Sequence, residues 1–245
     1  MRLSTKLSNS AVLLTGASRG LGAALFRRLA AKGARVVGVA RDGAALERVV
    51  QQIREDGGAA YGLAFDVGDK HAVHRIAGAA TALVGPIDLL IHNASTLGPT
   101  PLRLLLDTEC EDLEQVLAVN LIGPFRLSKI VAGSMALRGR GTIVQLSSDA
   151  AVSAYPRWGA YSVSKAALDH LGRLFAAELD ELGVRVLNVD PGEMNTVMHA
   201  AAIPDADPST LADPETIAAR IVGLLEVDTL PNGARVEASA LEAAS

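Results

Sequence analysis

Residues 11–22 have the sequence AVLLTGASRGLG, and this stretch decides the fold. Residues 11–15 form a short apolar run typical of a buried strand, and glycines follow it at positions 16, 20 and 22. The next residues have the apolar spacing of a helix, which Gly33 closes. Glycines also serve plain tight turns, but between a strand and a helix they let the backbone approach a pyrophosphate. The stretch therefore predicts the first βα unit of a dinucleotide-binding fold.

The same alternation of short apolar runs and longer amphipathic stretches continues along the chain. We expect strands at residues 11–15, 35–40, 60–65, 87–92, 142–147 and 184–189, and a weaker one at 235–238. Their near-continuous apolarity indicates a parallel sheet buried on both faces, and parallel strands need right-handed crossover helices. The prediction is a single α/β domain over residues 1–245, a Rossmann-like doubly wound parallel sheet of about seven strands with helices on both faces.

Capping patterns mark the ends of several predicted helices. Thr108 and Glu111 have the spacing of a capping box, which predicts a long helix from there to about Arg138. Asp213 followed by Pro214 predicts the start of the last helix, and Gly57 closes the second. Residues 194–214 have no clear period and are rich in Ala, Pro and Asp. Because long loops in compact domains are often functional, they are a candidate substrate lid.

Composition and charge argue against several classes of protein. The net charge is -4, so there is no general attraction for nucleic acid or for an anionic membrane surface. The polar residues 1–10 lack a secretory signal, and the apolar runs stop short of the ~20 residues that span a bilayer. The one cysteine, Cys110, cannot form an internal disulfide and is expected to be buried or inert. We expect a cytoplasmic protein without a metal site.

The end of the second predicted strand is Ala40-Arg41. In a dinucleotide fold that prefers NAD, an acidic residue at this point accepts hydrogen bonds from the ribose hydroxyls. Arg41 can instead bind a 2′-phosphate, and Arg19 in the glycine loop is a second charge-assisted partner. The alternatives are two solvated surface arginines, or an ion pair between Arg41 and Asp42. We expect NADP(H) as the cofactor, with NAD(H) as the second choice.

Tyr161 and Lys165 are four residues apart at the start of a predicted helix, so both project from one face. An adjacent ammonium group favours the phenolate, which is expected to lower the tyrosine pKa from about 10 toward neutrality. Tyr161 then becomes usable as a general acid or base. The same spacing also occurs among ordinary amphipathic residues, so its meaning depends on the other motifs.

Taken together, the motifs resemble those of the classical short-chain dehydrogenases/reductases across nearly the whole chain. The matching elements, in order, are the glycine loop at residues 15–22, Asp66-Val67, Asn93-Ala94, Asn120, Ser148, Tyr161, Lys165 and Pro191-Gly192.

This resemblance implies a catalytic tetrad. Tyr161 exchanges the proton and Ser148 orients the carbonyl by a hydrogen bond. Lys165 holds the nicotinamide ribose and lowers the pKa of Tyr161, while Asn120 supports a water leading to Lys165. Ser148 has the family's separation from Tyr161, so the neighbouring Ser147 is expected to be structural.

The resemblance also implies the cofactor contacts. The glycine loop is expected to face the pyrophosphate, Asp66 and Val67 the adenine, Asn93 and Ala94 the ribose, and a last group the carboxamide. Local turn capping is the alternative for Asp66 and Asn93. The expected cofactor residues are Gly16, Ser18, Arg19, Gly20, Leu21, Gly22, Arg41, Asp66, Val67, Asn93, Ala94, Tyr161, Lys165, Pro191, Gly192 and Thr196.

Two features depart from the family pattern. The usual Asn-Asn-Ala-Gly stretch is His92-Asn93-Ala94-Ser95, and the glycine-rich tail is missing. We expect His92 to be a strand-end residue with a satisfied ring rather than an extra acid or base. The altered tail puts a tetramer contact by the last strand in doubt.

The predicted function is that of an NADPH-dependent carbonyl reductase or alcohol dehydrogenase. The resemblance implies a homodimer or homotetramer, with contacts through the helices starting near Thr108 and Gly159. The substrate is left open, because it depends on the packing of Asp149, Ala150, Tyr155, Arg157, Trp158 and Met198. The alternatives are a non-catalytic NADP-binding regulator with the same fold and, less favoured, a methyltransferase.

Overall fold

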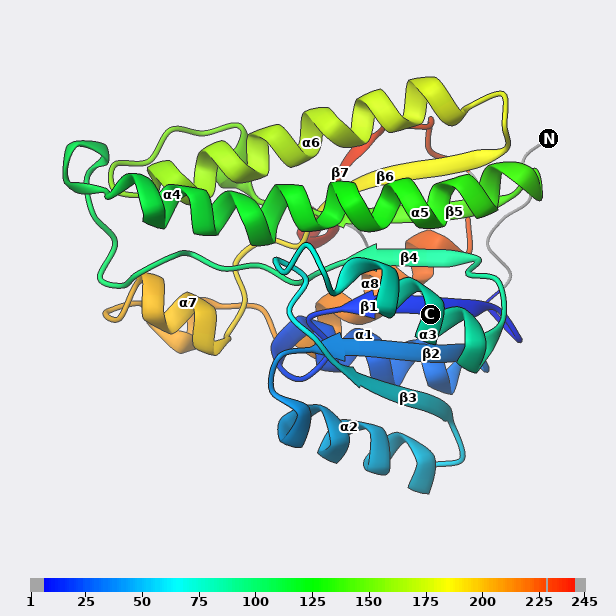
Figure 1. Cartoon of the computed structure of the whole chain (residues 1–245). Coiled ribbons are helices and arrows are strands. Elements are labelled where there is room, and N and C mark those ends of the chain that lie inside the picture. Colours follow the sequence, from blue (N-terminus) through cyan, green and yellow to red (C-terminus); the bar gives the residue numbers. More distant parts are fainter. Residues whose placement is uncertain (1–6, 228, 241–245) are drawn as a thin grey trace.

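The computed structural model describes residues 7–227 and 229–240 of the 245-residue chain, so part of the polar N-terminus and the end of the tail lie outside it. Within these ranges, seven strands form one parallel sheet in the order β3-β2-β1-β4-β5-β6-β7 (Figure 1). This confirms the predicted fold class. The strands are β1 (Ala11–Thr15), β2 (Arg35–Ala40), β3 (Ala59–Ala64), β4 (Leu89–His92), β5 (Gly141–Leu146), β6 (Val184–Asp190) and β7 (Arg235–Glu237).

Helices connect the strands and cover both faces of the sheet. The described helices are α1 (Gly20–Ala31), α2 (Gly43–Glu55), α3 (Val73–Val84), α4 (Cys110–Leu117), α5 (Gly123–Leu137), α6 (Gly159–Leu179), α7 (Val197–Ala202) and α8 (Pro214–Leu225). Short turns of 3₁₀ helix lie at η1 (Leu105–Asp107), η3 (Asp149–Ala151), η4 (Pro208–Thr210) and η5 (Ala238–Ala240), and a π-helical turn lies at η2 (Ala118–Ile122).

Alternate residues of each strand point to opposite faces of the sheet, which divides the core into two layers. On one face, Leu14 of β1 belongs to the cluster formed with α1, α2 and α8. On the other face, Leu13 belongs to the cluster formed with α3, α5 and part of α6. Because both faces are covered, the strands are apolar without the alternation of a half-exposed sheet.

Most predicted boundaries agree with the structure. Gly33 and Gly57 have φ angles of +82° and +84° just after α1 and α2, the left-handed conformation that ends a helix with glycine. The Asp213 side chain caps α8 by accepting a hydrogen bond from the Thr216 backbone N–H. β4 is shorter than expected and begins at Leu89.

The predicted capping box at Thr108 is wrong. α4 begins at Cys110, its N-cap residue is Glu109, and Glu109 makes no capping hydrogen bond with its side chain. The Thr108 hydroxyl instead donates to the Leu104 carbonyl at 2.9 Å, within the η1 turn. A local side-chain bond to the preceding turn has replaced the bond to the helix. Cys110 is exposed there as a free thiol.

The helix from Cys110 to Leu137 is continuous through the π turn and, although Gly123 and Arg126 break its apolar run as expected, it is the one described helix that is long and apolar enough to cross a membrane. It has 28 residues, and a window of 18 residues has a mean hydropathy of 1.4. Length and composition alone would let it cross a membrane, but core helices pass the same test. Here 44% of that window is buried, and α5 packs its apolar face on the sheet.

Candidate active site

The glycine loop lies at the carboxyl end of β1 and is tightly packed. Gly16 has a φ of +71°. A Cβ atom on Gly22 would come within 1.9 Å of the Gly16 carbonyl oxygen, so only glycine fits there. The Asn93 side chain, which follows β4, donates hydrogen bonds to the carbonyl oxygens of Thr15 at 3.1 Å and Gly16 at 3.0 Å. Asn93 thus fixes the glycine loop to the end of the neighbouring strand β4.

A cavity of about 450 Å³ opens beside this loop along the carboxyl ends of the strands. All the cofactor residues expected from the sequence line it except Gly192, which lines an adjoining cavity. The structure therefore brings together glycine-loop, strand-end and helix residues that are far apart in the chain. Those lining the cavity are Gly16, Ser18, Arg19, Gly20, Leu21, Gly22, Arg41, Asp66, Val67, Asn93, Ala94, Tyr161, Lys165, Pro191 and Thr196.

Arg19 and Arg41 are exposed and line the cavity. Asp42 does not pair with Arg41, because its side chain caps α2 through the backbone N–H of Ala45 at 2.9 Å. Arg41 lies 3.9 Å from Asp66, a loose ion pair between exposed side chains. Asp66 also accepts the Gly68 backbone N–H at 2.8 Å, so it stabilises its own turn.

Tyr161 and Lys165 lie on the buried face of α6, with 8% and 3% of their surface exposed. The Lys165 ammonium lies 5.5 Å from the centroid of the Tyr161 ring and donates to the Leu146 carbonyl at 2.6 Å. The expected proximity is therefore present. Burial lowers the pKa of Lys165 to about 8, while the carboxylates of Asp169 and Asp190 act to raise it.

The predicted direction of the Tyr161 pKa shift is wrong for this structure. Burial raises the pKa of Tyr161 to about 12, and nearby Asp190 and Asp149 raise it further, while Ser148 and Ser95 act in the opposite direction. Burial disfavours the charged phenolate, and this effect is larger than that of the opposing hydrogen bonds. Tyr161 is therefore a protonated phenol at neutral pH.

Ser148 follows β5, and its hydroxyl forms a hydrogen bond that lowers the pKa of Tyr161. The Ser148 hydroxyl donates to Asp149 Oδ1 at 2.9 Å, and Asp149 Oδ2 accepts from the Tyr155 hydroxyl at 2.9 Å. The Ser148 oxygen also accepts the Ala150 backbone N–H at 3.2 Å, which starts the η3 turn. Ser147 is buried, with 3% of its surface exposed.

Asn120 lies in the π-helical turn η2, and such turns often occur at functional sites. Its amide nitrogen donates to Ser164 Oγ at 2.9 Å, and its amide oxygen accepts the Thr96 backbone N–H at 2.8 Å. The side chain therefore ties η2 to α6 one residue before Lys165.

His92 is a buried residue at the end of β4. Its Nε2 lies 2.7 Å from Ser128 Oγ, and burial lowers its pKa to about 3. The ring is neutral and has a hydrogen-bonding partner, as expected for a structural residue.

A second cavity of about 310 Å³ adjoins the first and shares Tyr161 with it. The expected residues Asp149, Ala150, Tyr155, Trp158 and Met198 line it, whereas Arg157 does not. Trp158 packs edge-on against Tyr161 with ring centroids 5.7 Å apart.

Several residues of this second cavity were not named from the sequence. Leu97, Ala202 and Ile203 extend its apolar wall, and Glu193 and His199 add polar groups. His199 Nε2 lies 3.6 Å from Glu193 Oε1. These residues come from irregular segments and from α7, where no periodic pattern signals which side faces the cavity. Glu193 follows Pro191-Gly192, and that adjacency was the one available signal.

Known proteins are similar to this chain in sequence and in fold. The family of short chain dehydrogenases matches residues 10–207. Dehydrogenase/reductase SDR family member 4 from Bos taurus is 38% identical over 191 residues, which cover 78% of this chain and 67% of that protein. The chain belongs to the short-chain dehydrogenase/reductase family of oxidoreductases. It spans 64%, 67% and 70% of the length of three curated relatives.

Two solved structures are similar over almost their whole length. A metagenomic short-chain oxidoreductase in complex with NADP is 32% identical, with a TM-score of 0.79 over 91% of this chain and 94% of that one. A 7α-hydroxysteroid dehydrogenase complexed with NADH and 7-oxo glycochenodeoxycholic acid is 27% identical, with a TM-score of 0.85 over 95% of this chain and 93% of that one.

The residues of this chain fit a nicotinamide dinucleotide. The glycine cradle that a Cβ atom would fill, the start of α1 beside it and the cavity of about 450 Å³ supply the space and the backbone donors.

Proposed function

We propose that this protein is an NADPH-dependent carbonyl reductase or alcohol dehydrogenase, which moves a hydride between the nicotinamide ring and a ketone or secondary alcohol. One observation carries the proposal. Tyr161 lines both cavities, with Lys165 in the one beside the glycine loop and Ser148 in the other. A proton-transfer group at the junction of a cofactor cavity and a substrate cavity is what this reaction requires.

The bound cofactor would supply the hydride, and the chain's own residues would orient the carbonyl and move the proton. The protonated Tyr161 hydroxyl donates to the carbonyl oxygen, and Ser148 releases Asp149 to donate a second hydrogen bond to the same oxygen. Lys165 holds the nicotinamide ribose. Asn120 fixes the turn beside Lys165 and supports a water that leads to it. In the oxidation of an alcohol the same groups act in reverse.

Arg19 and Arg41 support a preference for NADPH. Both are exposed cations that line the cofactor cavity, and the acidic residue nearest to Arg41 in sequence, Asp42, is engaged as a helix cap. A 2′-phosphate suits two guanidinium groups, whereas the ribose hydroxyls of NAD suit a free carboxylate.

The second cavity favours an uncharged carbonyl compound. Its wall includes the apolar side chains of Leu97, Trp158 and Ile203. The acidic residues that line it are Asp149, Asp190 and Glu193, and among the described residues no Lys or Arg lines it. A carboxylate or phosphate on the substrate would meet like charge there.

Residues 194–214 form the candidate lid over this cavity. Met194 and Ala212 pair as an isolated bridge, so both ends of the segment are held together while α7 between them carries Met198 and His199 into the cavity. Closure over a substrate would move this segment as one piece.

We further propose a homodimer or homotetramer in the cytoplasm. Phe125 on α5 and Val163 and Leu174 on α6 are apolar and 41% to 50% exposed, as expected for a surface that a second subunit covers. The exposed thiol of Cys110 suits a reducing compartment.

The test is an absorbance assay of NADPH and NADH oxidation with a panel of ketones, each paired with an analogue that carries a carboxylate. We expect turnover of the neutral member of each pair, with NADPH preferred. NADPH binding without turnover of any member would instead support the non-catalytic regulator. Light scattering after size exclusion gives the subunit number, and a monomer would contradict the proposed assembly.

A further inference from the structure

Two buried carboxylates act on the charge state of Lys165. Asp169 is one helical turn further along α6, and Asp190 is the last residue of β6. Their side chains are 4% and 5% exposed. Asp169 Oδ1 has no hydrogen-bonding partner among the described residues. Buried carboxylates of this kind need a compensating cation.

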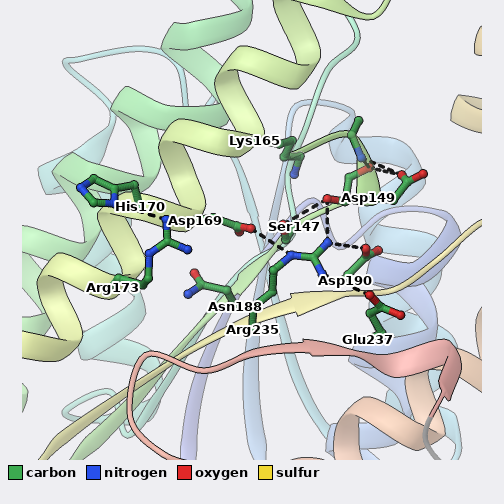
Figure 2. A network of polar contacts seen from close by, with 12 residues as sticks. Ser147, Asp149, Lys165, Asp169, His170, Arg173, Asn188, Asp190, Arg235 and Glu237 are labelled. Atoms are coloured by element: carbon green, nitrogen blue, oxygen red, sulfur yellow. Dashed lines mark hydrogen bonds and ion pairs between the residues drawn. The ribbon is translucent and has the colours of Figure 1, made fainter. Parts of the chain in front are cut away.

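Arg235, on the short strand β7, supplies that cation (Figure 2). Its Nε lies 3.2 Å from Asp169 Oδ2, and its Nη2 lies 2.7 Å from Asp190 Oδ2. The same Nη2 donates to the backbone carbonyl of Ser148 at 3.0 Å. One guanidinium group therefore joins α6, the end of β6 and the turn that carries the candidate catalytic serine.

The remaining contact of Arg235 is weaker. Its Nη1 lies 3.4 Å from Glu237 Oε1, and the Glu237 side chain is 61% exposed. The buried ion pairs with Asp169 and Asp190 are therefore expected to be stronger than the exposed ion pair with Glu237.

We propose that Arg235 is a positioning residue of the active site, which neutralises Asp169 and Asp190 near Lys165 and fixes the backbone at Ser148. Its part in turnover rests on the proposed function, whereas its effect on Lys165 can be measured without any reaction.

The charged groups that act on Lys165 lie on two elements, α6 and β6. Asp169 is on the same helix and Asp190 on β6, and both favour the ammonium form and so act to raise the pKa of Lys165. His92 on β4 is neutral. Asp149, in η3, acts with Asp190 on Tyr161.

With Arg235 removed, Lys165 would be the buried cation left to balance the carboxylates of Asp169 and Asp190. We therefore expect the pKa of Lys165 to move upward from about 8, by roughly one unit or more.

The first experiment uses the cofactor-free protein. In the wild type, the lowered pKa of Lys165 means that the unfolded chain holds a proton that the folded chain has lost between pH 8 and about 10.5. The free energy of unfolding should therefore rise between pH 8 and 10. In Arg235→Met that rise should shrink or vanish, while Arg235→Lys, which keeps the charge, should restore it.

A matched control is Arg173→Met, which removes an exposed cation from α6, the helix that carries Lys165 (Figure 2). It should keep the rise seen in the wild type. An Arg235→Met variant that is destabilised equally at pH 8 and pH 10 would show a merely structural ion pair and would overturn the proposal.

If Arg235→Met does not fold, the same comparison is made between Asp169→Asn and Asp169→Asn/Arg235→Met, since the double variant leaves one fewer buried carboxylate unpaired. An identical pH dependence in that pair would likewise overturn the proposal.

The second experiment follows turnover against pH with a ketone that the wild type reduces. The apparent pKa in the pH profile of turnover that reports on Lys165 should be about one unit higher in Arg235→Met. In Arg235→Lys it should return to the wild-type value. An unmoved profile in a folded, active variant would contradict the positioning role. Absence of turnover in the wild type would contradict the proposed function instead, and the unfolding comparison would still decide the role of Arg235.

Discussion

The ring of His92 and the hydroxyl of Ser128 form a buried pair, with Nε2 and Oγ 2.7 Å apart between β4 and α5. Both side chains are almost completely buried, so the ring stays neutral. His92, which departs from the family pattern, therefore anchors the end of β4. The next residue, Asn93, holds the glycine loop.

This pair predicts a loss of stability in mild acid. The pKa of His92 is lowered to about 3 in the folded protein, so the unfolded chain binds a proton below about pH 6.5 that the folded chain does not. Between pH 7.5 and pH 5 the free energy of unfolding should fall by about 2 kcal/mol more in the wild type than in His92→Gln. Urea unfolding at the two pH values measures this difference.

The exposed His71→Gln is the control, and it should keep the wild-type response. If the free energy of unfolding depended on pH equally in the wild type and in His92→Gln, the buried ring would not be kept neutral by the fold.

Gly22→Ala should abolish NADPH binding and lower the melting temperature. The added Cβ would lie 1.9 Å from the Gly16 carbonyl oxygen and 2.5 Å from Asn93 Nδ2, so the glycine loop would have to open. Gly78→Ala, at an exposed position of α3 where a Cβ meets nothing within 4 Å, is the matched control. It should be neutral or more stable by about 0.5–1 kcal/mol. NADPH binding by Gly22→Ala with wild-type affinity would contradict the assigned cradle.

Arg41→Ala should discriminate between the two cofactors. Loss of a charge-assisted hydrogen bond to the 2′-phosphate should raise the KM for NADPH roughly 10- to 100-fold, with little effect on NADH. Arg48→Ala, on the exposed side of α2 and outside the cavity, should change neither. A similar change for both cofactors would show that Arg41 does not recognise the phosphate.

The sequence was sufficient for the fold, and all but one of the cofactor residues expected from it line one cavity, because the relevant signals are local. Apolar runs such as residues 11–15 and 35–40 coincide with β1 and β2. The glycine loop and the strand-end residues also carry recognisable motifs, and the parallel topology places them along one edge of the sheet.

Other features depend on tertiary packing and could not be predicted. The raised pKa of Tyr161 reflects how completely its own side chain is buried, which the spacing to Lys165 does not reveal. The contacts of Arg235 join residues more than forty positions apart through a strand of three residues, a segment with only a weak strand signal. Thr108 shows that a capping pattern can be overridden by the turn before it.

The central claim is that Tyr161 transfers the proton, and Tyr161→Phe tests it most directly. Turnover of a ketone and the affinity for NADPH, followed by cofactor fluorescence, are measured together, with Tyr61→Phe on β3 as the matched control. We predict that Tyr161→Phe loses roughly 10²–10⁴-fold in kcat and binds NADPH almost as the wild type does, while Tyr61→Phe stays active. A Tyr161→Phe variant that turns over at a rate close to the wild type would contradict the account.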